Sequence, residues 1–124
     1  MGVAKKIQIP SKSLQWVMAH LREKVRNWPE RVQEDLGHEL ERVQWNKQPI
    51  HFREMPTIGP GVREIKVVED ATKSQYGAIY IAKFKEAVYV LHVITSKTSE
   101  KTLPSDIELA QKRLKALVKW RAEQ

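Results

Sequence analysis

The sequence contains no cysteine, no long apolar run and no pattern of an export signal. Without cysteine the chain forms no disulfide and offers no thiolate to a metal, a composition typical of cytosolic proteins. Every apolar run is far shorter than the roughly 20 residues that a bilayer requires, so we expect no membrane-spanning segment. The basic residues after Met1 are not followed by the apolar stretch of a signal peptide. We therefore expect a cytoplasmic protein.

Motifs of several enzyme classes are also missing. There is no glycine-rich loop to cradle a phosphate and no serine-nucleophile motif, and Gly59-Pro60-Gly61 is interpreted as a chain reversal. The histidines are too dispersed for the spacing of metal ligands. They are His20, His38, His51 and His92. We expect the protein to use neither a metal nor a cofactor.

Charge of one sign is in excess. The 124 residues include 22 Lys and Arg against 15 Asp and Glu, which gives a formal net charge of +7 and a pI of about 9.7. A small domain this basic attracts polyanions, because each phosphate that it neutralises releases condensed counterions. Solubility or an acidic protein partner explains the same excess, so composition alone leaves these alternatives open.

The length predicts one domain. Residues 1–12 are polar and basic and are predicted to be a flexible lead-in, and residues 13–124 are predicted to form the single domain. Residues 14–28 are ambiguous, because their apolar positions fit helical spacing while Leu14 and Trp16 alternate as in an edge strand.

A clearer helix follows. Asn27 is its predicted N-cap and Pro29 lies in its first turn. Its apolar stripe consists of Val32, Leu36, Leu40 and Val43. Residues 45–61 are rich in proline and glycine and are predicted to be a loop or turn.

Three strand-like runs and a helix complete the chain. The strands are predicted at residues 62–68, 76–84 and 87–95, joined by short turns as in an antiparallel meander. The last two are apolar on both faces, as in central strands covered on each side. Ser105 and Glu108 form a capping-box pattern for a C-terminal helix. The element order predicts an α+β fold.

An ordered series of short motifs between residues 13 and 121 resembles the phage-derived branch of the RelE/HigB toxin superfamily. The pieces are SLQWV at 13–17, WP at 28–29, LG at 36–37, LERVQ at 40–44, MP at 55–56, IGPGVREIK at 58–66, IYIAKF at 79–84, AVYVLH at 87–92, KTLP at 101–104, DIELA at 106–110 and KRL at 112–114. Each piece is weak by itself, and the series in order is specific.

The resemblance implies a RelE-like fold with an N-terminal edge strand, a helical pair, a curved antiparallel sheet and a C-terminal helix. It resolves the ambiguous segment into a strand at residues 14–17 and a short helix ending at Asn27.

The resemblance also implies the toxin of a type II toxin–antitoxin system. Most such toxins cleave messenger RNA on the ribosome and thereby inhibit translation, whereas a sister branch poisons DNA gyrase. The implied partner is a helix-turn-helix antitoxin of the HigA type, through which alone the toxin would contact operon DNA. No membrane partner is implied.

Metal-free cleavage of this kind uses the RNA 2′-hydroxyl as nucleophile and needs a base, an acid and cations that stabilise the phosphorane. Lys66 stands where relatives usually carry an arginine, and it shares a strand face with Glu64. His92 lies at the end of an apolar strand. Relatives carry a pair of lysines in the loop after this strand, and Lys97 is the one that this sequence keeps. These three are the predicted catalytic residues, although Lys66 also fits a solvated strand position and His92 a packed core histidine.

The predicted RNA or phosphate contacts are Arg63, Tyr80, Lys83 and Lys101. Tyr80 fits base stacking, but a position in the core is the favoured interpretation.

Two positions depart from the family pattern. Gly77 stands where relatives usually have an arginine that contacts the phosphate, and Ser96 or Thr95 replaces one lysine of the pair. Either other cations have taken over, or the chain is a non-enzymatic relative that binds its antitoxin or targets gyrase. The sequence leaves both alternatives open, as it does the base preference.

Overall fold

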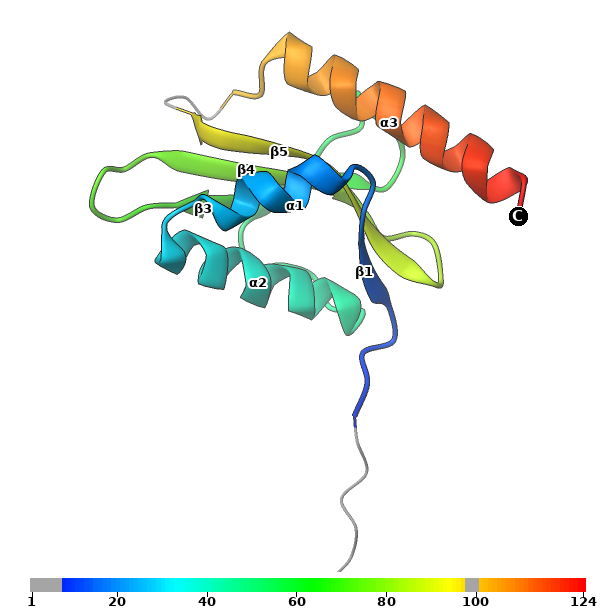
Figure 1. Ribbon diagram of the computed structural model, residues 1–124, viewed down its shortest axis with the longest axis horizontal. Coiled ribbons are helices and arrows are strands. Elements are labelled where there is room, and N and C mark those ends of the chain that lie inside the picture. The colour runs from blue at the N-terminus through cyan, green and yellow to red at the C-terminus, as the bar shows by residue number, and fades with distance from the viewer. Residues whose placement is uncertain (1–7, 98–100) are drawn as a thin grey trace, which may run out of the picture.

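The computed structural model describes residues 8–97 and 101–124, without the side chain of Lys97, and it is an α+β fold (Figure 1). The elements are β1 (Ser13–Trp16), α1 (Ala19–Arg26), α2 (Glu30–Gln44), β2 (Phe52–Glu54), β3 (Val62–Val68), β4 (Gln75–Ile81), β5 (Ala87–Lys97) and α3 (Pro104–Ala122). The predicted fold class, the edge strand with its short helix, and the C-terminal helix are all confirmed.

One five-stranded sheet forms the centre of the molecule, in the order β1-β5-β4-β3-β2. The pairs β2–β3, β3–β4 and β4–β5 are antiparallel, which confirms the predicted meander. The sheet is nevertheless mixed, because β1 lies parallel to β5. A parallel pair needs a long connection, and here the whole chain from α1 to β4 separates the two strands.

The strand β2 lies inside the segment predicted to be a loop, so that prediction is wrong at Phe52–Glu54. Its three residues are too few for a periodic pattern, and it adds to the sheet edge through pairing with β3. The buried carboxylate of Glu39 on α2 holds the approach to this strand. It accepts the backbone N–H of Ile50 at 3.0 Å and that of His51 at 2.8 Å.

Helices cover both faces of the sheet, with α1 and α2 on one face and α3 on the other (Figure 1). Strands β4 and β5 therefore bury side chains on both sides, as predicted. The face under α1 and α2 contributes Ile65, Val67, Tyr76, Ala78, Tyr80, Val88, Val90 and Val93. The face under α3 contributes Val62, Ile79, Ile81, Ala87, Tyr89, Leu91 and Ile94.

Both predicted helix caps are wrong. Asn27 is the C-cap of α1, because its N–H bonds the carbonyl of Lys24, and Pro29 is the N-cap of α2. In α3 the N-cap is Leu103 and Pro104 opens the helix, so Ser105 lies inside the first turn and no side-chain cap bond forms. Proline is favoured at the first helical position, and this preference prevailed over the capping-box pattern.

The last residue of the predicted lead-in is bound to the domain. The Lys12 ammonium donates to the carbonyl of Phe84 at 2.7 Å and to that of Ala82. Residues 1–7 lie outside the described part, so a flexible lead-in over residues 1–12 stays a prediction.

The two-sided core makes a direct prediction. Leu91 is fully buried between β5 and α3, whereas Leu103 is 60% exposed. Leu91→Ala should lower the free energy of unfolding by about 2–5 kcal/mol through lost burial and a residual cavity. Leu103→Ala should change it by less than about 0.5 kcal/mol. Urea unfolding of the two variants checks this, and equal effects would contradict the assigned packing.

Candidate functional site

The sheet face under α3 places two rows of side chains next to each other. Directly opposed residues of paired strands share a face, so Glu64, Ile79 and His92 form one row and Lys66, Gly77 and Ile94 the next. By register, the predicted catalytic residues Lys66 and His92 lie on the same face, on β3 and β5 with β4 between them. They line different pockets, however, because Lys66 lines one with Asp35 and His51, whereas His92 lines one with Lys101.

A register irregularity turns His92 toward α3. Ile79 pairs with His92 while Tyr80 pairs with Val90, so β5 carries one extra residue, Leu91. Such a bulge redirects side chains and frees backbone groups. The carbonyl of Leu91 accepts a hydrogen bond from Arg113 of α3 at 3.1 Å.

Both ring nitrogens of His92 are engaged. Its Nε2 lies 2.7 Å from Asp106, and Arg113 lies 2.8 Å from its Nδ1. Arginine can only donate, so Nδ1 accepts and the ring proton lies on Nε2, from which it is donated to Asp106. Burial lowers the pKa of His92 from its ordinary 6.5, although the Asp106 carboxylate acts in the opposite direction. The imidazole is therefore neutral and held rigidly.

In the same row as His92, with Ile79 of β4 between them, lies a fully buried carboxylate, that of Glu64. Arg53 of β2 donates from Nε to Oε1 at 3.1 Å, and the Thr102 hydroxyl donates to Oε2 at 3.1 Å. Arg53 also donates to the Thr102 hydroxyl at 2.5 Å. A buried charge requires such partners, so this cluster ties β2, β3 and the segment before α3 together.

Gly77 leaves the space that this carboxylate occupies. A Cβ atom at position 77 would lie 3.1 Å from Oε2 of Glu64, closer than an ordinary contact. The resemblance implies an arginine at this position. Here Glu64 packs against the glycine, and the guanidinium of Arg53 is bonded to the same carboxylate. The carboxylate beside position 77 therefore has a cationic partner from a different strand, β2.

A groove of about 500 Å³ opens beside this cluster at the start of α3. Lys24 of α1 and Lys101 contribute positive charge to it, and His92 and Asp106 form part of its wall. Ser96 also lines it, in a left-handed backbone conformation with φ of 52°. The side chain of the predicted catalytic residue Lys97 lies outside the described residues.

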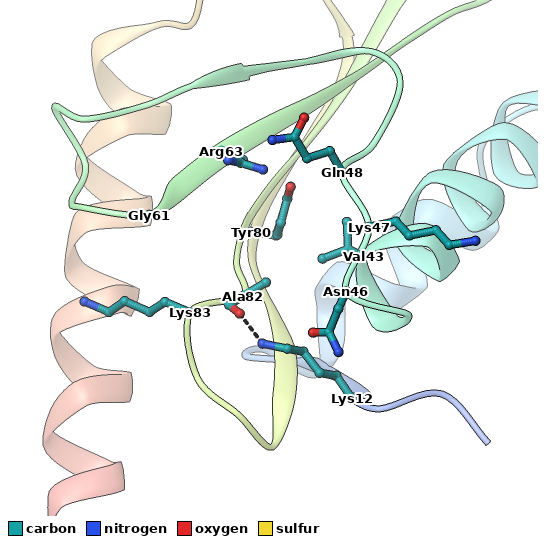
Figure 2. A pocket seen from close by; sticks show the side chains of 10 residues that line it. All are labelled: Lys12, Val43, Asn46, Lys47, Gln48, Gly61, Arg63, Tyr80, Ala82 and Lys83. Carbon is teal, nitrogen blue, oxygen red and sulfur yellow. Dashed lines mark hydrogen bonds between the residues drawn. The ribbon is translucent and has the colours of Figure 1, made fainter.

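The predicted RNA contacts do not all share this face. Lys101 lies at the groove, but Arg63, Tyr80 and Lys83 line a separate pocket on the α2 side of the sheet (Figure 2). Strand alternation predicted that Arg63 and Lys66 face opposite ways, and the structure agrees. Tyr80 is almost wholly buried, as its core interpretation predicted.

The sequence analysis missed the two partners of Glu64, which are Arg53 and Thr102. It also missed the two partners of His92, which are Asp106 and Arg113. Glu64 carried a usable signal, because an acidic residue between the apolar positions Val62 and Ile65 of a strand demands a buried partner. Nothing in the sequence identified that partner, since Arg53 lies in a segment interpreted as loop.

Two further properties concern the described residues only. Residues 8–97 and 101–124 contain no group of three or more His, Asp or Glu side chains placed to hold a metal ion. None of the helices found there is long and apolar enough to cross a membrane.

Comparison with known families identifies the class of protein. The family model described as phage-derived protein Gp49-like (DUF891) matches residues 23–115. That range covers well over half of the chain, so the chain belongs to the Gp49-like family. This is a toxin-like family of the RelE/ParE-type superfamily, which indicates the toxin of a toxin–antitoxin system with an antitoxin as partner. No curated protein and no solved structure matches the chain.

The space at Gly77 is testable. Gly77→Ala should lower the free energy of unfolding by about 1–3 kcal/mol, because the added methyl group displaces a carboxylate held by Arg53 and Thr102. Gly37→Ala is the matched control: nothing lies within 4 Å of its added Cβ, and alanine favours a helix by up to about 1 kcal/mol. Opposite signs in urea unfolding are expected, and stabilisation by both would contradict the crowded site.

The pKa of His92 predicts a pH dependence. The unfolded chain protonates this histidine near its ordinary pKa of 6.5, whereas burial delays protonation in the folded chain to a lower pH. The contribution of His92 to stability is therefore present above 6.5 and is lost as the pH falls below that value. The hydrogen bond from Arg121 lowers the pKa of Glu86 from 4.5 to about 2, so the stability that this carboxylate contributes is lost only below pH 4.5. The pH ranges in which His92 and Glu86 reduce stability are therefore distinct. Urea unfolding across this range should show the earlier loss in the wild type and a flatter profile in His92→Gln. Identical profiles would contradict the assignment.

Proposed function

We propose that the protein is a RelE/HigB-type toxin that cleaves messenger RNA on the ribosome without a metal and thereby inhibits translation. The observation that carries the proposal is the set of basic residues on the sheet near Gly77, where the resemblance implies an arginine. Arg53 is paired with the Glu64 carboxylate beside Gly77, and Lys66 is the cross-strand partner of Gly77. Lys101 lines the groove that His92 also lines. Family membership supplies the toxin class, and the net charge of +7 favours a polyanionic target.

The proposed reaction is an intramolecular phosphoryl transfer within the RNA chain. A base removes the proton of the 2′-hydroxyl, the O2′ atom attacks the adjacent phosphorus, and the bond from phosphorus to the 5′ oxygen breaks. An acid protonates that leaving oxygen, and a 2′,3′-cyclic phosphate remains. Cations lower the barrier because they stabilise the extra negative charge of the phosphorane, and losing one such donor costs roughly 10²–10³ in rate.

In this proposal Lys66, Lys97 and the guanidinium of Arg53 stabilise the phosphorane. His92 is the candidate acid or base. It can exchange a proton with RNA only if one of its two bonds opens, and the bond to Arg113 is the one that a phosphate would weaken by attracting the guanidinium. Asp106 would keep the ring oriented through Nε2 meanwhile.

The second candidate is a non-enzymatic relative that binds its antitoxin or targets gyrase. The engagement of both His92 nitrogens favours this alternative, because the imidazole has no nitrogen available to a substrate in this arrangement. In either case we propose a helix-turn-helix antitoxin of the HigA type as partner and a cytoplasmic location. The basic surface supports an acidic partner segment, since complementary charge accelerates association.

The deciding experiment is controlled expression followed by mapping of RNA 5′ ends. For the wild type we expect growth arrest, cleavage ends at ribosomal A sites, and relief by a helix-turn-helix protein encoded next to the toxin gene. The double variant Lys66→Ala/Lys97→Ala should cleave about 10²-fold or more slowly, since two cations are lost. The control Lys73→Ala/Lys112→Ala removes equal charge from exposed sites and should cleave as the wild type does.

The other outcomes are equally specific. Full cleavage by Lys66→Ala/Lys97→Ala would contradict the assigned residues. Unaltered transcripts with a DNA-damage response would indicate gyrase as the target, and tight antitoxin binding without growth arrest would indicate a silent relative.

A further inference from the structure

A second cationic site lies on the face opposite the α3 groove. It is a pocket of about 310 Å³ between the end of α2 and the strands β3 and β4 (Figure 2). Its cationic lining residues are Lys12, Lys47, Arg63 and Lys83, and no carboxylate is among the described residues that line it. A concave surface lined by one sign of charge concentrates the potential that attracts an anion.

The floor of this pocket carries an unused donor. Tyr80 is 1% exposed, and its hydroxyl has no hydrogen-bond partner of good geometry in the structure. Figure 2 shows this hydroxyl directed toward Arg63 and Gln48. Burial raises the pKa of Tyr80, and the nearby Arg63 guanidinium partly offsets that rise. A buried polar group without a partner costs free energy, so a ligand that accepts a hydrogen bond here gains an interaction that the protein alone lacks.

The cations of the pocket can contact a ligand in addition to their contacts within the protein. Nε of Arg63 donates to Glu54 at 2.9 Å, which uses one of the five N–H donors of the guanidinium. The ammonium of Lys12 is bonded to Ala82 and Phe84 and so keeps its charge at the wall. Lys83 flanks the mouth on an exposed side chain that can turn toward a ligand.

We infer that the pocket around Arg63 and Tyr80 binds a phosphate group of an RNA backbone, at a place separate from the cleavage groove. The inference rests on the proposed function for the identity of the polyanion. Phosphate accepts several hydrogen bonds at once, which matches a guanidinium, a phenol and ammonium groups around one cavity.

The sheet edge connects the two sites. Arg53 and Glu54 are neighbours on β2, and they pair with Glu64 and Arg63 of β3. Arg53 serves the α3 face while Arg63 serves the opposite pocket, so only the edge strand separates the two guanidinium groups. A strand with repeated phosphates that passes around β2 would reach both, and this favours RNA over a single acidic side chain.

The test uses the full chain, labelled with ¹⁵N, and a single-stranded RNA oligomer whose 2′-hydroxyls are methylated so that it is not cleaved. We expect amide shifts at Gly61, Arg63, Tyr80 and Ala82. Arg63→Gln should reduce the slope of log affinity against log salt by about one, since one phosphate contact is lost. Lys73→Gln, which removes a charge from the β3–β4 turn at the other end of the strands, should retain the slope.

Tyr80→Phe separates recognition from folding. The protein loses only a hydroxyl that has no bond in the free structure, so its melting temperature should equal or exceed that of the wild type, while its affinity for the oligomer should fall several-fold. Unchanged affinity in both Tyr80→Phe and Arg63→Gln would overturn the inference.

The same NMR experiment, repeated with other ligands, distinguishes RNA from other anions. RNA-induced shifts confined to the α3 groove would overturn the inference and leave the proposed function intact. Shifts in the pocket without cleavage in expression experiments would support the inference and contradict the proposed enzyme. Pocket shifts with inorganic phosphate or with an acidic peptide, but none with RNA, would also overturn it.

Discussion

The carboxylate of Glu64 is the constraint on which the α3 side of the molecule depends. It is fully buried, and a buried charge left without partners costs several kcal/mol. Its partners come from two distant parts of the chain, Arg53 on β2 and Thr102 before α3. The ion pair therefore attaches a three-residue edge strand that could not hold itself, and it fixes the point from which α3 starts.

The same carboxylate crowds position 77, where the resemblance implies an arginine. Gly77 lies where a side chain would meet Glu64, and a guanidinium is supplied from β2 instead. The carboxylate beside Gly77 is thus paired with a guanidinium from the edge strand.

The sheet divides the basic side chains between two faces. Alternation along β3 sends Lys66 toward α3 and Arg63 toward α2, and β4 does the same for Gly77 and Tyr80. The α3 face combines a groove with the His92 network, and the α2 face combines cations with an unpartnered phenol. A long polyanion can contact both, which a compact anionic ligand cannot.

The amino-acid sequence by itself determined the fold class, the meander, and the burial of β4 and β5 on both faces, because these follow from the period of the apolar residues. It also determined that Arg63 and Lys66 face opposite ways, since strand alternation is a local property. It could not yield the strand β2, whose three residues carry no period, nor the parallel pairing of β1, which depends on a distant strand. Only the tertiary structure decided that His92 is held by Asp106 and Arg113, that Glu64 and Arg53 meet beside Gly77, and that the predicted RNA contacts divide into two sites. These are contacts between side chains far apart in the chain, and their geometry is set by the packing of α3 and β2 on the sheet.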